Sequence, residues 1–93
     1  MSKLDNEYIR IVTVTNPLGL HARPAAMIAK RAMQARSGVW MIRNGEHVDA
    51  SSIIDILSLA CTLGSRITLK IENPSDIDIL DDISALFEKG FDE

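Results

Sequence analysis

The feature that most constrains the fold of this chain is an alternation between short β-branched segments and apolar segments with helical spacing. Residues 8–15 read YIRIVTVT, with Val12 and Val14 on one face, which predicts a half-buried strand. Residues 25–35 are rich in alanine, and their apolar positions recur at helical spacing. The same alternation continues along the chain and predicts the order β-α-β-β-α-β-α.

The remaining strands are delimited by turn signals. Residues 39–43 lead into Asn44-Gly45, a pair that accepts the positive φ angles of a type I′ hairpin, and residues 46–50 then return antiparallel. Residues 66–72 form a further strand. We therefore predict an α+β fold, a two-layer sandwich in which three helices cover one face of a four-stranded antiparallel sheet and leave the other face open.

The sequence also indicates where the helices begin and end and which of their residues face the protein core. Ser52 precedes the apolar run at residues 53–63 and can cap it, while Gly64 would end it. A last helix follows the Asn73-Pro74 turn. The positions expected to face the core are Ala25, Ile28, Ala29 and Ala32 in the first helix and Leu80, Ile83 and Phe87 in the last.

Length and composition exclude several classes of protein. Ninety-three residues suit one compact domain, 1–93, and 46% hydrophobic with 25% charged residues is a globular composition. The net charge of −3 argues against a nucleic-acid partner. No apolar run resembles a signal peptide or a bilayer-spanning segment, so we expect a cytoplasmic monomer without membrane insertion. Cys61 stands alone in an apolar run and is predicted to be a buried thiol.

The chemistry of the chain concentrates at His21, where a glycine-containing loop meets the start of a helix. A helix start presents unpaired amide donors and a partial positive charge, which together favour an anion. Arg23 can add a bidentate guanidinium, and Pro24 presets the backbone angle of the first turn. An imidazole here is a plausible nucleophile for phosphorus. The alternative is that His21 caps the helix or has no role.

The string LGLHARPAA resembles the active-site signature of the HPr phosphocarriers of the sugar phosphotransferase system. The resemblance covers residues 11–87, including the RNG hairpin and SSIIDILSLACTLG. It implies the HPr-like fold and a phosphoryl group carried on Nδ1 of His21, steadied by Arg23 and by the backbone amides of Ala22 and Arg23. It also implies transfer from enzyme I to EIIA-type acceptor proteins, without a cofactor and without enzymatic turnover by the chain itself.

The second predicted helix is apolar over more of its surface than one core stripe requires. Ile56, Leu59, Ala60 and Leu63 are expected to be buried. Ile53, Ile54 and Leu57 are then left exposed beside Ser52. In the HPr resemblance these exposed residues form the docking surface for partner proteins together with Arg23, Ala26 and Lys30.

Ser52 matches the regulatory serine that an HPr kinase/phosphorylase modifies in some HPr proteins. The alternative is plain N-capping, which serine favours in any protein. Ser51 and Asp55 depart from residues that are common at their positions in the family, and both make this face less basic.

Two other functions remain open at this stage. A regulatory HPr paralogue in carbon or nitrogen control would share the chemistry of His21 and differ only in its partners. An α+β interaction or RNA-binding module would need exposed aromatic rings on its sheet, and Trp40 is the only ring in the second predicted strand. His47 has no ligand partners at a recognisable spacing, so we expect a surface side chain and no metal site.

Overall fold

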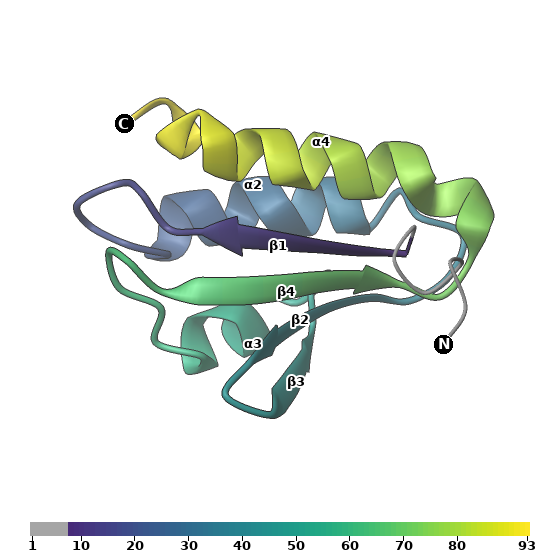
Figure 1. Ribbon diagram of the computed structural model, residues 1–93, viewed down its shortest axis with the longest axis horizontal. Coiled ribbons are helices and arrows are strands. Elements are labelled where there is room, and N and C mark those ends of the chain that lie inside the picture. Colours follow the sequence, from purple (N-terminus) through teal and green to yellow (C-terminus); the bar gives the residue numbers. More distant parts are fainter. Residues whose placement is uncertain (1–7) are drawn as a thin grey trace.

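The computed structural model describes residues 8–93 and contains one antiparallel sheet with the strand order β1-β4-β2-β3 (Figure 1). Residues 1–7, which carry most of the charged N-terminal stretch, lie outside the described residues. The strands are β1 (Ile9–Thr13), β2 (Val39–Arg43), β3 (Glu46–Asp49) and β4 (Arg66–Ile71). Asn44 and Gly45 both adopt positive φ, of 51° and 81°, so the predicted hairpin between β2 and β3 is confirmed.

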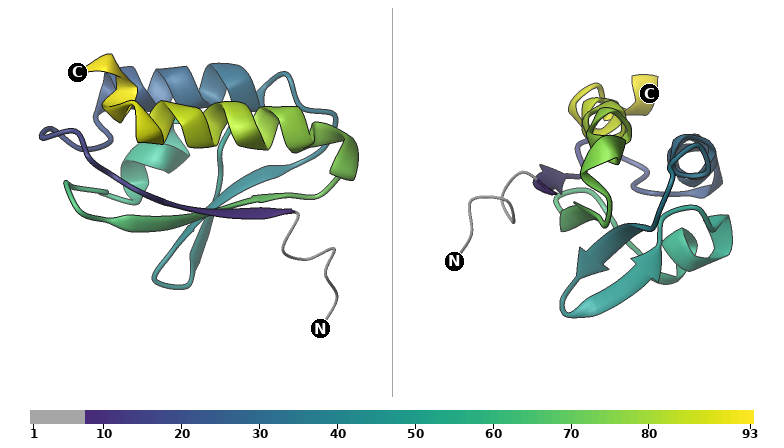
Figure 2. Two further views of the ribbon diagram at one scale, coloured as in Figure 1. Left: turned by 45° about the horizontal axis from the view of Figure 1, so that its top comes forward. Right: turned by 90° about the vertical axis from the view of Figure 1, so that its right-hand side faces the viewer.

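Three α-helices lie on one side of this sheet, which confirms the open-faced α+β sandwich (Figure 2). They are α2 (Ala22–Ala32), α3 (Ile53–Ser58) and α4 (Ile77–Glu88). The positions expected in the core from the first and last helices are buried, and Val12 and Val14 of the sheet side are buried as well. Cys61 is buried as predicted, and this burial raises the pKa of its thiol, so the group behaves as a small apolar side chain.

The second helix is shorter than the sequence predicts. It ends at Ser58 rather than at Leu63, and Gly64 is not its stop, because Ala60 already adopts a left-handed φ of 51°. The Arg43 guanidinium donates to the carbonyl of Leu59 at 2.8 Å, which satisfies a carbonyl at the end of the helix. Ala60 and Leu63 are consequently exposed, contrary to expectation, whereas Ile56 and Leu59 are buried.

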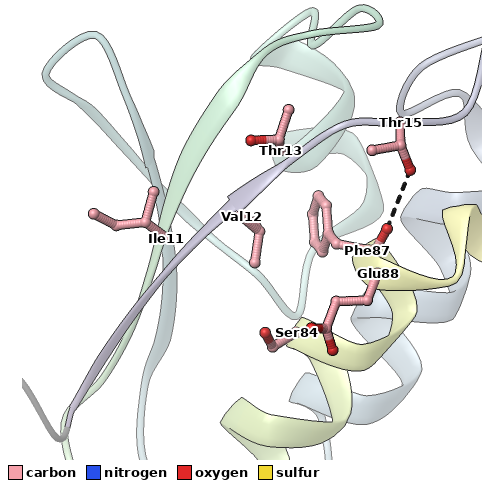
Figure 3. A pocket seen from close by; sticks show the side chains of 7 residues that line it. All are labelled: Ile11, Val12, Thr13, Thr15, Ser84, Phe87 and Glu88. Carbon is pink, nitrogen blue, oxygen red and sulfur yellow. Dashed lines mark hydrogen bonds between the residues drawn. The ribbon is translucent and has the colours of Figure 1, made fainter.

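The end of α4 is fastened to the rest of the fold. Gly90, Phe91 and Asp92 follow the helix with positive φ between 57° and 61°, a conformation that side-chain-bearing residues rarely adopt. Phe91 is 1% exposed and packs edge-on against Phe87, with ring centroids 4.9 Å apart, and this burial holds the turn in place. Figure 3 shows that Thr15 donates a hydrogen bond to the carbonyl of Phe87, which ties this region to the segment after β1.

As a result, the last residues of the chain lie at the same end of the molecule as the loop that joins β1 to α2 (Figure 1). This loop contains the sequence from Asn16 to His21. The proximity is a tertiary arrangement, because 72 positions separate His21 from Glu93.

Candidate functional site

His21 occupies the N-cap position of α2, in an extended conformation with φ −76° and ψ −171°. Its backbone carbonyl accepts the amide of Ala25 at 3.1 Å, but its side chain makes no capping hydrogen bond to any residue in the described range. The structure therefore rejects the alternative that the imidazole of His21 caps the helix. The amides of Ala22 and Arg23 belong to the first turn, which has no carbonyl one turn earlier to accept from it.

The residues around this helix start favour a negative charge. The first turn consists of Ala22, the exposed Arg23 and the buried Pro24, and Pro24 has no amide hydrogen to leave unpaired. Lys30 and Arg31 lie in the last turn, where cations complement the helix dipole. The helix dipole and the Arg23 guanidinium therefore act at the same end of α2 as the His21 imidazole.

The loop before His21 is positioned by the segment that follows the shortened α3. The amide of Leu20 donates to the carbonyl of Cys61 at 2.9 Å, and Leu20 itself is buried. Gly19 has a φ of +70°, and a Cβ atom there would lie 2.5 Å from the Cys61 oxygen. Only glycine lets the loop pass this close to the segment around Cys61.

Two residues at the site were not identified from the sequence. Oε2 of Glu93 lies 2.7 Å from Nε2 of His21. Asn16, which is 2% exposed, donates from Nδ2 to Oε1 of Glu93 at 2.9 Å and to the carbonyl of Gly19 at 2.7 Å. The hydrogen bond from Asn16 holds the pKa of the Glu93 carboxyl below its usual value, with smaller contributions from His21 and Arg23. No local sequence signal joins these residues, because Asn16 reads as a turn residue and Glu93 as a surface charge.

A shallow hollow of about 470 Å³ opens at this place and is lined by Pro17, Leu18, His21, Arg23 and Glu93. Two other hollows carry no comparable chemistry. One, of about 300 Å³, includes Trp40 and His47, which is exposed as expected. The other, of about 230 Å³, lies between β1 and α4 and is lined by Val12, Thr15, Phe87 and four further residues (Figure 3).

The family model for the phosphorylation site of the HPr component of the phosphotransferase system matches residues 9–89. The chain belongs to the HPr family. Family membership makes the protein a phosphocarrier of the phosphotransferase system, a carrier rather than an enzyme, and it separates the chain from RNA-binding α+β modules.

Relatives and solved structures agree with this assignment. The chain is 40% identical to the phosphocarrier protein HPr of Cupriavidus necator over 84 residues, which cover 90% of this chain and 94% of that protein. It is 37% identical to the phosphocarrier protein NPr of Escherichia coli K12, over 88% of this chain and 92% of that protein. A crystal structure of HPr from Thermoanaerobacter tengcongensis superposes with a TM-score of 0.85 at 30% identity, covering 91% and 96% of the two chains.

The predicted docking residues of this HPr family member are exposed. Ile53, Ile54 and Leu57 are 40%, 79% and 39% exposed, and Ala26 and Lys30 on α2 are exposed as well. Because α2 and α3 pack against each other, the two groups belong to neighbouring elements. The sequence missed Leu18, which is 74% exposed and borders His21 directly.

Ser52 is the N-cap of α3, and its hydroxyl accepts the amide of Asp55 at 3.2 Å. The capping role considered from the sequence is thereby confirmed. Asp49 and Asp55 lie close by, since the amide of Asp49 donates to the Asp55 carboxylate at 3.4 Å. The surroundings of Ser52 are thus already acidic.

Within residues 8–93, no group of three or more His, Cys, Asp or Glu side chains is arranged to hold a metal ion. None of the helices in the same range has the length and apolar character needed to cross a bilayer.

Proposed function

We propose that the protein accepts a phosphoryl group on Nδ1 of His21 from phosphorylated enzyme I and passes it to EIIA-type acceptor proteins. The observation that carries this proposal is the N-terminus of α2, where the His21 side chain leaves the helix uncapped beside Arg23. A nucleophilic ring and a helix start without a side-chain cap then coincide in one place.

The chemistry follows from this arrangement. A phosphoryl group brings about two negative charges and several acceptor oxygens. The amides of Ala22 and Arg23 can donate to these oxygens, and the Arg23 guanidinium supplies a planar pair of further donors. These groups stabilise the phosphorylated form without sealing it from water or from a second protein, since 36% of the His21 side chain is exposed.

The same proposal assigns the docking face to Ile53, Ile54 and Leu57, with Arg23, Ala26 and Lys30 alongside. Exposed apolar side chains bordered by cations suit a transient interface with an acidic partner. Leu18 extends this face past His21, so that a partner bound there would cover the phosphoryl group.

The decisive experiment is incubation with purified enzyme I and phosphoenolpyruvate carrying labelled phosphate. We expect one acid-labile, base-stable phosphoryl group on the wild-type protein and none on His21→Ala. The control is His47→Ala, which removes the other histidine from an exposed position on β3. Labelling that persists in His21→Ala, or that disappears in His47→Ala, would contradict the assignment.

The choice between sugar import and a regulatory role depends on partners. HPr-named and NPr-named relatives are similar at 40% and 37% identity, so sequence similarity favours neither role. Of the two roles, we propose phosphoryl transfer in sugar import. The labelled protein should then transfer its phosphoryl group to a sugar-specific EIIA domain faster than to an EIIA domain of a regulatory system, and the reverse order would make it a regulatory paralogue.

Ser52 is proposed as a site where an HPr kinase/phosphorylase regulates docking. Its hydroxyl is half-buried beside the exposed Ile53 and Ile54, so a phosphate there would place charge at the docking face. For Ser52→Asp we expect a higher Michaelis constant of enzyme I for this carrier, more at low salt than at high salt. Ser58→Asp, at the other end of α3, is the control for added charge alone, and an equal effect of both variants would remove Ser52 from this role.

A further inference from the structure

The contact between His21 and Glu93 determines which ring nitrogen of His21 carries the proton. A neutral imidazole donates from one nitrogen and accepts at the other, so its partner decides between the two tautomers. Nε2 of His21 lies 2.7 Å from Oε2 of Glu93. The protonation state of that carboxyl therefore decides what Nε2 must do.

Asn16 holds the Glu93 carboxylate in place. Its Nδ2 group faces two oxygens, Oε1 of Glu93 and the carbonyl of Gly19. Turning the amide over would bring Oδ1 against these two acceptors, so the orientation of Asn16 is settled by its partners. Its Oδ1 atom is buried without a partner among residues 8–93, which is an unfavourable arrangement that the two donated bonds offset.

The carboxylate is held by polar contacts at both of its oxygens, to Asn16 and to His21. The side chain is 14% exposed, and Phe91, two residues earlier, is buried against Phe87. Its pKa is lowered, first by the hydrogen bond from Asn16 and then by His21 and Arg23. An ionised carboxylate can only accept, so the hydrogen between it and His21 belongs to Nε2.

We propose that Glu93 is a positioning residue that holds the proton of His21 on Nε2 and so presents the lone pair of Nδ1 to phosphorus, with Asn16 as the clamp on Glu93. The inference rests on the proposed function, in which His21 is the phosphoryl acceptor.

The phosphoryl transfer balances with this tautomer. The lone pair of Nδ1 forms the new N–P bond while the bond between phosphorus and the donor atom of phosphorylated enzyme I breaks, and the electron pair of that bond returns to the donor atom. The Nε2 proton of His21 does not move. The ring becomes a phosphorylated imidazolium, and Glu93 then faces a positive charge, which strengthens its hydrogen bond. A carboxylate at this position therefore serves both the acceptor tautomer and the product.

Glu93→Gln gives a sharp test because Asn16 controls the orientation of the new amide. Nδ2 of Asn16 is a donor, so the amide oxygen of the glutamine should take the position of Oε1 and accept from it. The NH₂ group of the glutamine would then take the position of Oε2 and donate to Nε2 of His21. We expect the proton to move to Nδ1, the reverse of the wild-type tautomer. Glu93→Ala removes the partner without imposing the reversal and should give a mixture of the two tautomers.

The tautomer is read by long-range ¹H–¹⁵N NMR of ¹⁵N-histidine-labelled, unphosphorylated protein at pH about 8.5, where histidine side chains are neutral. The matched control is Asp92→Asn, which removes a carboxylate at the next position, keeps its side chain exposed and tolerates the φ of 59° there. We expect the Nε2–H form in the wild-type protein and in Asp92→Asn, and the Nδ1–H form in Glu93→Gln. A mixed wild-type tautomer, or equal shifts in the two variants, would overturn the positioning role.

Phosphorylation by enzyme I provides the second readout. Glu93→Gln should be phosphorylated roughly fivefold more slowly, the population change that one hydrogen bond produces, and Asp92→Asn within twofold of wild type. The two proposals fail differently. Wild-type protein with the Nε2–H tautomer but without labelling would refute the proposed function alone, whereas labelling at an equal rate in Glu93→Gln would refute the role of Glu93 alone.

Discussion

The helices α2 and α3 pack against each other, yet the chemistry at their starts is opposite. At α3 the Ser52 hydroxyl accepts the amide of Asp55, and the Asp55 carboxylate occupies the first turn. At α2 the His21 side chain turns away from the helix toward Glu93, and the first turn carries Arg23. One helix start is closed by its own residues and the other is left open.

The difference shows what makes a helix start available to an anion. Both starts have unpaired amides and the positive end of a dipole, so neither feature by itself distinguishes them. The distinguishing feature is whether the chain already supplies an acceptor. The length also differs, because α2 has 11 residues and α3 has 6. A phosphoryl group at α2 would meet a helix start without a side-chain cap, whereas at α3 it would displace the Ser52 cap next to Asp55.

The largest effect is expected where the loop before α2 contacts the segment that follows the end of α3. Gly19→Ala would place a Cβ atom 2.5 Å from the Cys61 oxygen at a φ of +70°. We expect a loss of about 2 kcal/mol or more in the free energy of unfolding, measured by urea denaturation. Gly64→Ala is the control, since φ is +90° there but none of the described atoms lies within 4 Å of the added Cβ. Equal losses would mean that the contact with Cys61 contributes nothing.

The next largest effect is expected on the rate of phosphoryl transfer, from a substitution at the uncapped start of α2. Arg23→Lys keeps the charge but loses the planar, two-donor grip on a phosphoryl group, so transfer from enzyme I should slow by about tenfold. Single-turnover rates with labelled enzyme I measure this change. Arg36→Lys makes the same substitution on an exposed residue just past the other end of α2 and should leave the rate unaltered. A rate for Arg23→Lys equal to that of the wild-type protein would remove Arg23 from the site.

A substitution at the capped start of α3 should change the thermal stability of the protein rather than the rate of phosphoryl transfer. Ser52→Ala loses the hydrogen bond to the Asp55 amide, which should cost about 1 kcal/mol and lower Tm by about 4–8 °C. Ser58→Ala, in the last turn of the same helix, should change Tm by less because no N-cap is lost. If His21→Ala lowered Tm as much as Ser52→Ala, the two helix starts would not differ in capping.

The smallest effect is a pH dependence carried by Glu93. Its pKa in the folded protein lies below 4.5, the value of an unperturbed glutamate, so the folded state binds this proton more weakly than the unfolded state. The stabilisation is therefore present above pH 4.5 and disappears as the pH falls through the lower folded value. Glu93→Gln should be less stable than wild type at pH 7, and the difference should vanish in acid. A stability difference between Glu93→Gln and wild type that stays constant from pH 7 to pH 3 would contradict the lowered pKa of Glu93.

Local signals were sufficient for most of the fold. The Asn44-Gly45 turn, the Ser52 cap and the alternation in β1 are properties of neighbouring residues, and each was predicted correctly because its cause lies within a few positions. The location of His21 at a helix start follows in the same way from Pro24 and the glycine-containing loop. These signals, with the LGLHARPAA string, also led to the family.

Tertiary structure decided the end of α3 and the surroundings of His21. Helix α3 ends at Ser58, where Ala60 turns to a left-handed φ and Arg43, 16 positions from Leu59, donates to the Leu59 carbonyl. Helical periodicity in the sequence gives no sign of this contact. Asn16 and Glu93 meet only because the sheet and α4 return the chain to the loop before α2, across a separation of 77 positions. The sequence by itself determined that an imidazole, His21, stands at the start of a helix beside Arg23. The packing of distant segments decided that Nε2 of this ring faces Glu93, because hydrogen-bond partners are set by position in space.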